Sequence, residues 1–185
     1  MNIYCLNYLK NLGVTIYGKN IKISKLVQIY NPKNIILHDN IRIDDFTILS
    51  GNGIIEIGNY VHIAPQCTIS SNITIKLSDF SGLSSGVKIF GSSDDYSGKY
   101  LTNPTVPDKY KRIIKGSVIL EKHVIVGSNS VILPNIILKE GTAIGTLSLV
   151  NKSTDEWNIY AGIPIKLIKK RNFNCLKLEK QLNNN

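Results

Sequence analysis

Cysteine is scarce in this chain. The 185 residues include only Cys5, Cys67 and Cys175, which stand far apart and form neither a Cys-x-x-Cys pair nor a metal-ligand spacing. This pattern argues against a fold held together by disulfides and predicts that the protein binds no metal. Cys67 falls where the repeat described below requires a small core residue.

Long hydrophobic runs are absent as well. No stretch of 18 apolar residues exists, which is about the length that a transmembrane helix needs. The N-terminal sequence MNIYCLNYLKN lacks the apolar core and the small-residue cleavage site of a signal peptide. We therefore expect a soluble, cytoplasmic protein with no stable membrane insertion.

Acidic residues are few compared with basic ones. Thirteen Asp and Glu face 22 Lys and Arg, which gives a formal net charge of +9. The lysines are scattered, no aromatic residues interleave with a basic stripe and no nucleic-acid-binding motif occurs, so we expect no nucleic-acid partner. The basic excess is strongest near the C-terminus, at Lys166, Lys169, Lys170, Arg171, Lys177 and Lys180. Such a cluster suits either a solvated helix or the phosphates of a soluble cofactor.

An aliphatic residue returns every six positions along most of the chain. In the N-terminal half the steps are six, six and eight residues, in the series Tyr17, Ile23, Ile29, Leu37, Ile43, Leu49, Ile57, Ile63, Ile69, Leu77, Leu83 and Ile89. Later the step stays at six, in the series Leu120, Val126, Ile132, Leu138, Ile144 and Val150. Neither a strand period of 2 nor a helix period of 3.6 gives this spacing, and a β-sandwich gives no reason for it. The pattern predicts an all-β chain, folded as a parallel β-helix of hexapeptide repeats.

The repeat also predicts the organisation of the chain. Residues 1–16 form an amphipathic cap on the first coil, and residues 17–151 form the β-helix. Within it, residues 90–117 break the repeat and must leave it as a loop, which its tyrosines favour as an ordered arm. Residues 152–185 form a C-terminal extension that ends in a helix over 175–182.

Two segments carry a family resemblance. HVIVGSNSVILPNIILKEGTAIGTLSLVNK, followed by IYAGIPIKLIKKR, resembles the C-terminal half of the hexapeptide-repeat acetyltransferases that act on galactosides and maltose. The loop sequences DDYSG and NPTVP are similar to those of the group that acetylates sugars of bacterial surface polysaccharides. The resemblance implies a left-handed β-helix, a homotrimer, acetyl-CoA as the acyl donor and an active site between adjacent subunits.

The same resemblance implies a set of cofactor residues. Ser128 and Thr146 match coil positions that contact the pantetheine arm, and Pro164 matches a residue beside the adenine. Asn151 and Lys152 replace a Thr-Lys pair of the family, while Lys166 and Lys169 match basic residues near the nucleotide phosphates. The chain departs from the family pattern at Ile125, where a Trp is usual, and at Thr146-Leu147, where Ala-Gly is usual.

The catalytic base needs a separate argument, because acetyl transfer requires a group that takes the acceptor's proton. The family's His position holds Asp94, and an aspartate with a pKa of about 3.9 is a poor base for a hydroxyl. Of His38, His62 and His123, only His62 is expected to point outward beside open space, because Gly82 follows it in the stack and Arg42 precedes it. We predict His62 as the base, oriented by Asp94 or Asp95 from the same or a neighbouring subunit. The alternative is that one of these two aspartates is itself the base, with a pKa raised by burial at the subunit interface.

Tyr96 of the loop and Arg42 beside His62 are predicted to bind the acceptor. No nucleophile motif occurs, so the acetyl group should pass directly to the acceptor in a ternary complex. The favoured function is a sugar O-acetyltransferase for surface polysaccharide. An N-acetyltransferase of a nucleotide-linked amino sugar and a non-enzymatic scaffold remain as alternatives, and the acceptor sugar stays open.

Overall fold

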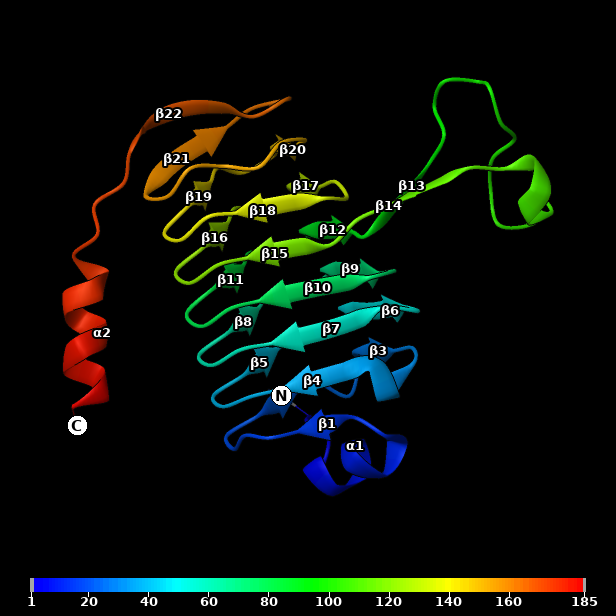
Figure 1. Cartoon of the computed structure of the whole chain (residues 1–185). Coiled ribbons are helices and arrows are strands. Elements are labelled where there is room, and N and C mark those ends of the chain that lie inside the picture. The colour runs from blue at the N-terminus through cyan, green and yellow to red at the C-terminus, as the bar shows by residue number, and fades with distance from the viewer. Residues whose placement is uncertain (1, 185) are drawn as a thin grey trace.

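The chain coils into a triangular prism whose three faces are β-sheets with parallel strands, except for the antiparallel edge strand β22 of the second sheet (Figure 1). The structure, a computed structural model, describes residues 2–184. The first sheet contains β1 (Thr15–Ile16), β4 (Ile35–Leu37), β7 (Ile54–Ile57), β10 (Thr74–Leu77), β15 (Val118–Leu120) and β18 (Ile136–Leu138). The second contains β2 (Lys22–Ile23), β5 (Arg42–Ile43), β8 (His62–Ile63), β11 (Gly82–Leu83), β16 (Ile125–Val126), β19 (Ala143–Ile144), β21 (Asn158–Ala161) and β22 (Lys166–Lys170). The third contains β3 (Gln28–Ile29), β6 (Ile48–Gly51), β9 (Thr68–Ser71), β12 (Lys88–Phe90), β17 (Val131–Ile132) and β20 (Leu149–Val150). The predicted left-handed β-helix is confirmed.

The six-residue repeat lies on the inside of the prism. Leu37, Ile57 and Leu77 of the first sheet are all fully buried, as are their counterparts on the other two faces. Small and β-branched residues fill the turns between faces, where Thr47 and Ser130 have no exposed surface. Each coil therefore buries its apolar face against the next coil, and the stack forms one continuous core.

The first coil corrects one residue of the sequence analysis. The six-residue spacing predicts an inward side chain at Tyr17, but this residue is 73% exposed and its ring centroid lies 5.7 Å from that of His38. The first strand is shifted by one residue, so that Ile16 pairs with Leu37. A phenol is too bulky and too polar for a column of stacked leucines and isoleucines. The helix α1 (Leu6–Leu12) covers this end of the prism through the buried Leu9.

An arm leaves the prism between the third and first sheets. It begins as a two-stranded antiparallel ribbon, β13 (Ser92–Asp94) with β14 (Ile113–Lys115), and its far part contains the 3-10 helix η2 (Asp108–Tyr110). A second short 3-10 helix, η1 (Pro32–Asn34), lies at the same corner of an earlier coil. Figure 1 shows that the arm points away from the solenoid, and most side chains between residues 96 and 114 are exposed.

The C-terminal segment covers the other end and one side. The strand β21 pairs in parallel with β19 beyond residue 151, and β22 folds back on β21 as a hairpin. The helix α2 (Cys175–Asn183) then runs beside the coils, where Glu179 contacts His123 at 2.7 Å and Lys122 at 3.1 Å. Within residues 2–184 no helix is long and apolar enough to cross a membrane.

Candidate active site

Two corners of the prism carry the predicted site residues. We call the turn region between the second and third sheets the donor corner, which includes residues 64–66, 84–86, 127–129, 145–147 and 162–164. We call the turn region between the third and first sheets the arm corner, which includes residues 52, 72, 91–117, 133–135 and 151–152. The third sheet separates the two corners within one chain.

His62 lies at the edge of the donor corner and has a carboxylate partner. Its side chain projects outward from β8 and is 51% exposed, with Nε2 placed 2.8 Å from Oδ2 of Asp44. Asp44 comes from the coil below, and its side chain is only 7% exposed. The guanidinium of Arg42 donates from Nε to the other carboxylate oxygen of Asp44 at 2.7 Å. One buried carboxylate thus holds both outward side chains.

The Asp44 carboxylate determines which nitrogen of His62 is free. Burial alone would raise the pKa of Asp44, but the hydrogen bonds from Arg42 and His62 outweigh burial and hold that pKa below its ordinary value. An ionised carboxylate only accepts hydrogen bonds, so Nε2 of His62 must carry the proton. The lone pair of the neutral imidazole is therefore on Nδ1, which can accept a proton from a ligand.

A small open pocket adjoins His62. It has a volume of about 290 Å³ and is lined by His62, Ala64, Gly82, Leu83, Ser84, Ser85, Ile125 and Ser128. Cys67 lies behind its wall with Sγ 3.3 Å from the carbonyl oxygen of Ser84. Burial raises the pKa of the Cys67 thiol to about 11, so the sulfur is neutral and is not an available nucleophile. The pocket suits direct transfer at His62.

An apolar track continues along the donor corner toward the C-terminal end. Ser128 and Thr146 occupy successive coils here, and Pro164 follows β21 at the same corner. Beside them lies a second hollow of about 270 Å³, lined by Asn129, Val131, Leu147, Ser148, Leu149 and Ile163. Leu147 and Ile163 are 64% and 74% exposed, so the track offers apolar surface to a ligand or to another chain.

The remaining predicted cofactor residues lie elsewhere. Lys166 and Lys169 are exposed on β22, which follows the donor corner directly. Asn151 and Lys152 are exposed at the arm corner, just after β20. The seven residues carried over from the family resemblance therefore divide between the donor corner, the strand β22 and the arm corner.

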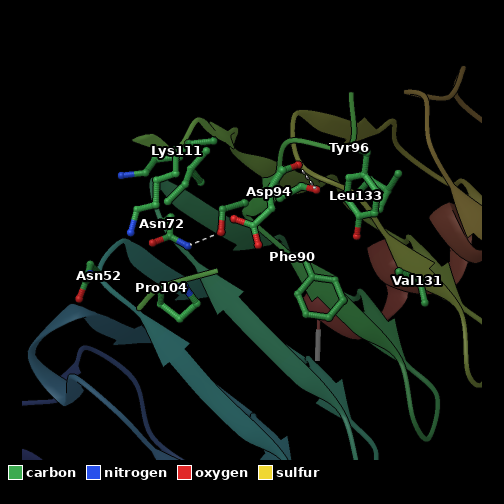
Figure 2. Close-up of a pocket in the computed structure, with 13 residues that line it drawn as sticks. Asn52, Asn72, Phe90, Asp94, Tyr96, Pro104, Lys111, Val131 and Leu133 are labelled. Atoms are coloured by element: carbon green, nitrogen blue, oxygen red, sulfur yellow. Dashed lines mark hydrogen bonds between the residues drawn. The ribbon is translucent and has the colours of Figure 1, made fainter. Parts of the chain in front are cut away.

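The base of the arm forms a hollow of about 700 Å³ (Figure 2). Asp94, Tyr96 and Lys111 line it from the arm, while Asn72 lines it from the coils and donates to Ser92 Oγ at 2.7 Å. The phenol of Tyr96 is 93% exposed. Asp95 turns instead toward Ser97, whose backbone N–H and hydroxyl donate to its carboxylate.

In one chain, then, the structure does not bring the three predicted catalytic residues together. His62 is at the donor corner, whereas Asp94 and Asp95 are at the arm corner, so the carboxylate that His62 contacts is Asp44 and neither of the predicted aspartates. Asp44 was not predicted as a site residue, although the sequence contains a signal for it. The repeat aligns Asp44 with Ser24, Ala64 and Ser84, and a charged residue in a column of small ones indicates a specific partner.

The residues that the structure describes include no group of His, Cys, Asp or Glu that could hold a metal ion.

Comparison with known proteins identifies the family. No family model matches the chain. The chain is 42% identical over 172 residues, 92% of its own length and 90% of the other, to an Escherichia coli dTDP-4-amino-4,6-dideoxy-D-glucose acyltransferase. It is 25% identical over 175 residues, 94% of its length and 80% of the other, to an E. coli K12 protein provisionally named a lipopolysaccharide biosynthesis O-acetyl transferase.

Solved structures agree. The crystal structure of AntD, an N-acyltransferase from Bacillus cereus in complex with dTDP and 3-hydroxybutyryl-CoA, superposes with a TM-score of 0.95 at 42% identity, over 100% of this chain and 98% of AntD. AntD has also been solved as S84A and D94N variants, and this chain carries Ser and Asp at the same two numbers. The chain therefore belongs to the hexapeptide-repeat, β-helix acyltransferase family and is an acyltransferase.

Proposed function

We propose that this enzyme transfers an acyl group from a coenzyme A thioester to the amino group of a nucleotide-linked amino sugar. The observation that carries the proposal is the 42% identity to a dTDP-4-amino-4,6-dideoxy-D-glucose acyltransferase and to the N-acyltransferase AntD, over nearly the whole of each chain. A site with a proton acceptor and an apolar donor track, but no activated nucleophile, supports direct transfer.

The sequence favoured a sugar O-acetyltransferase, with an N-acetyltransferase of a nucleotide-linked amino sugar as the alternative, and we now favour the alternative. O- and N-acyltransferases share the β-helix and the thioester donor, so the repeat and its C-terminal motifs do not distinguish them. The acceptor contacts the arm, whose sequence follows no repeat. The similarity to a dTDP-amino-sugar acyltransferase and to the N-acyltransferase AntD supports transfer to an amine, while the weaker similarity at 25% identity keeps transfer to a hydroxyl as the second candidate.

The proposed chemistry uses His62 and Asp44. The amine attacks the thioester carbonyl carbon, the carbon–sulfur bond breaks and the amine loses one proton, which ends on the departing sulfur. Nδ1 of His62 accepts that proton, and Asp44 stabilises the resulting imidazolium through Nε2. Ser84 and Ser128 supply hydroxyl donors on the same pocket wall.

The donor would lie along the donor corner. Its pantetheine arm fits the track beside Ser128 and Thr146, with the adenine near Pro164. Lys166 and Lys169, both exposed on β22, would then contact the phosphates. Asn151 and Lys152, at the other corner, would contact a donor held by the neighbouring chain.

The acceptor would lie in the hollow at the base of the arm. Asp94 can accept a hydrogen bond from the sugar's amine, Tyr96 offers a ring and a hydroxyl, and the hollow also contains Lys111. Arg42 is a further donor beside His62. Because the arm points away from its own solenoid, we propose a homotrimer in which the arm corner of one chain faces the donor corner of the next.

Two matched acceptors test the proposal. Acetyl-CoA and 3-hydroxybutyryl-CoA are offered with dTDP-4-amino-4,6-dideoxyglucose or with dTDP-6-deoxyglucose, which differ only in amine against hydroxyl, and product mass and thiol release are followed. We expect an amide product with the amino sugar and none with the hydroxyl sugar. Transfer to the hydroxyl sugar at a similar rate would contradict the proposal and support O-acylation.

A further inference from the structure

Gly82 differs from the other glycines in having no structural reason to be glycine. Of the fourteen glycines, all within residues 2–184, it alone combines an ordinary φ with no tight contact. A Cβ built on Gly82 would meet only the carbonyl oxygen of His62, at 3.8 Å. A Cβ on Gly127 would meet the backbone nitrogen of Thr146 at 2.6 Å. Gly86 has a φ of +76°, a backbone conformation that strains any residue with a side chain.

Gly82 also occupies a strand, where glycine is a poor choice. It pairs in register with His62 on one side and with Ile125 on the other. Glycine in a strand interior weakens the strand and gives it no side chain to pack, and it often marks a place where a ligand approaches closely. The fold would accept a larger residue here, so the missing side chain points to a ligand.

The column of outward side chains on the second sheet shows what the glycine leaves open. The column reads Lys22, Arg42, His62, Gly82, Ile125, Ala143 and Ile159. His62 and Ile125 are two strand spacings apart, about 9.5 Å, with no side chain between them. This notch is the floor of the pocket that also contains Ala64, Leu83 and Ser84.

We propose that the notch over Gly82 receives the acyl chain of the donor and that Gly82 and Ile125 set the chain length the enzyme accepts. This inference rests on the proposed function, because it takes the donor to be a coenzyme A thioester. A pantetheine arm that follows the donor corner reaches the notch from the side of Ser128 and ends beside His62. The group beyond the sulfur then lies over Gly82, between His62 and Ile125, where Ile125 offers an apolar side chain to a short chain such as butyryl.

The acceptor is the other possible occupant, and the arrangement argues against it. The hollow with Asp94 and Tyr96 lies at the arm corner, so an acceptor approaches His62 from outside the solenoid. The notch lies against the sheet itself, flanked by Ile125, which is 46% exposed and offers an apolar wall. A short acyl chain is the better chemical match.

The test compares Gly82→Val with Ala143→Val. The control adds similar bulk in the same column, one coil beyond Ile125 and outside the pocket lining. Binding of CoA, acetyl-CoA and butyryl-CoA is measured by calorimetry without an acceptor, so the result does not depend on which sugar is used. We expect Gly82→Val to lower the affinity for butyryl-CoA by about 10-fold or more and to change the affinity for CoA by less than about twofold. The affinities of Ala143→Val should stay close to those of wild type.

Further measurements separate the explanations. Ile125→Ala should raise the preference for butyryl-CoA over acetyl-CoA, and Gly82→Val should keep a Tm at or above that of wild type because the strand gains a β-branched residue. If Gly82→Val lowers the affinities for CoA, acetyl-CoA and butyryl-CoA equally, or raises only the KM for the amino sugar, the acyl-chain proposal is wrong. If wild-type enzyme binds butyryl-CoA as proposed but acylates no amino sugar, the proposed function fails and the notch assignment stands.

Discussion

Replacing Asp44 with asparagine tests the arrangement that carries the proposed chemistry. The side chain of Asp44 is buried and accepts hydrogen bonds from His62 at 2.8 Å and from Arg42 at 2.7 Å. Asparagine keeps the shape but removes the charge that stabilises the protonated imidazole. A hydrogen bond to a charged group contributes about 1.5 to 3 kcal/mol, which corresponds to a rate loss of about 10- to 150-fold. Because His62 is half exposed and water screens the pair, we expect the lower end of that range, about 10-fold in kcat.

The assay is thiol release from acetyl-CoA with dTDP-4-amino-4,6-dideoxyglucose at saturation. Asp45→Asn is the matched control, since it removes the same charge from the adjacent residue, whose backbone carbonyl binds Gln66 N–H and whose side chain does not contact His62. The donor KM should stay close to wild type in both variants. An Asp44→Asn enzyme as fast as Asp45→Asn would show that the Asp44–His62 contact has no part in catalysis.

Asp44 also predicts a pH dependence of stability. Its folded-state pKa is depressed, so the stability that it contributes is present above its unfolded pKa of about 3.9 and is lost as the pH falls through the folded pKa. His62→Ala should retain the fold and acetyl-CoA affinity but lose about 10²- to 10⁴-fold in turnover, and turnover above a third of wild type would remove it as the base. Lys166→Ala should raise the KM for acetyl-CoA several-fold, more at low than at high salt, while the sugar KM stays the same; an unchanged donor KM would leave the lysine as a solvated surface residue. Glu179→Gln should lower the free energy of unfolding by about 1.5 kcal/mol at pH 7. Burial would raise the pKa of Glu179, but the hydrogen bonds from His123 and Lys122 hold it below its ordinary value. The difference in stability from wild type should therefore disappear as the pH falls through that depressed pKa, and a difference that is constant with pH would contradict the ion-pair explanation.

The fold was predictable because burial in a β-helix is periodic. Every coil repeats the same environment, so Leu37, Ile57 and Leu77 could be assigned to the core from spacing alone. Tyr17 failed because the first coil has a neighbour on one side only, and the strand can shift by one residue to expose an unsuitable ring.

The candidate site was only partly predictable. The position of His62 beside Arg42 and Gly82 follows from the 20-residue register, which the strand pairing confirms. The bond from His62 to Asp44 joins different columns on adjacent coils, and it depends on side-chain orientation, which spacing does not specify. The arm follows no repeat, so its direction could not be predicted from the sequence. For the same reason the sequence did not predict the acceptor or the subunit that would bind it.

Mixing two inactive enzymes tests the central claim most directly, namely that one chain's donor corner and another chain's arm corner form each site. Chains with His62→Ala and chains with Asp94→Ala are unfolded together, refolded in equal amounts and assayed with acetyl-CoA and the dTDP-linked amino sugar. In every mixed trimer one junction joins an intact His62 to an intact Asp94, so activity should recover to roughly a quarter of the wild-type rate. A refolded trimeric mixture that stays as inactive as its two parents would contradict the shared site.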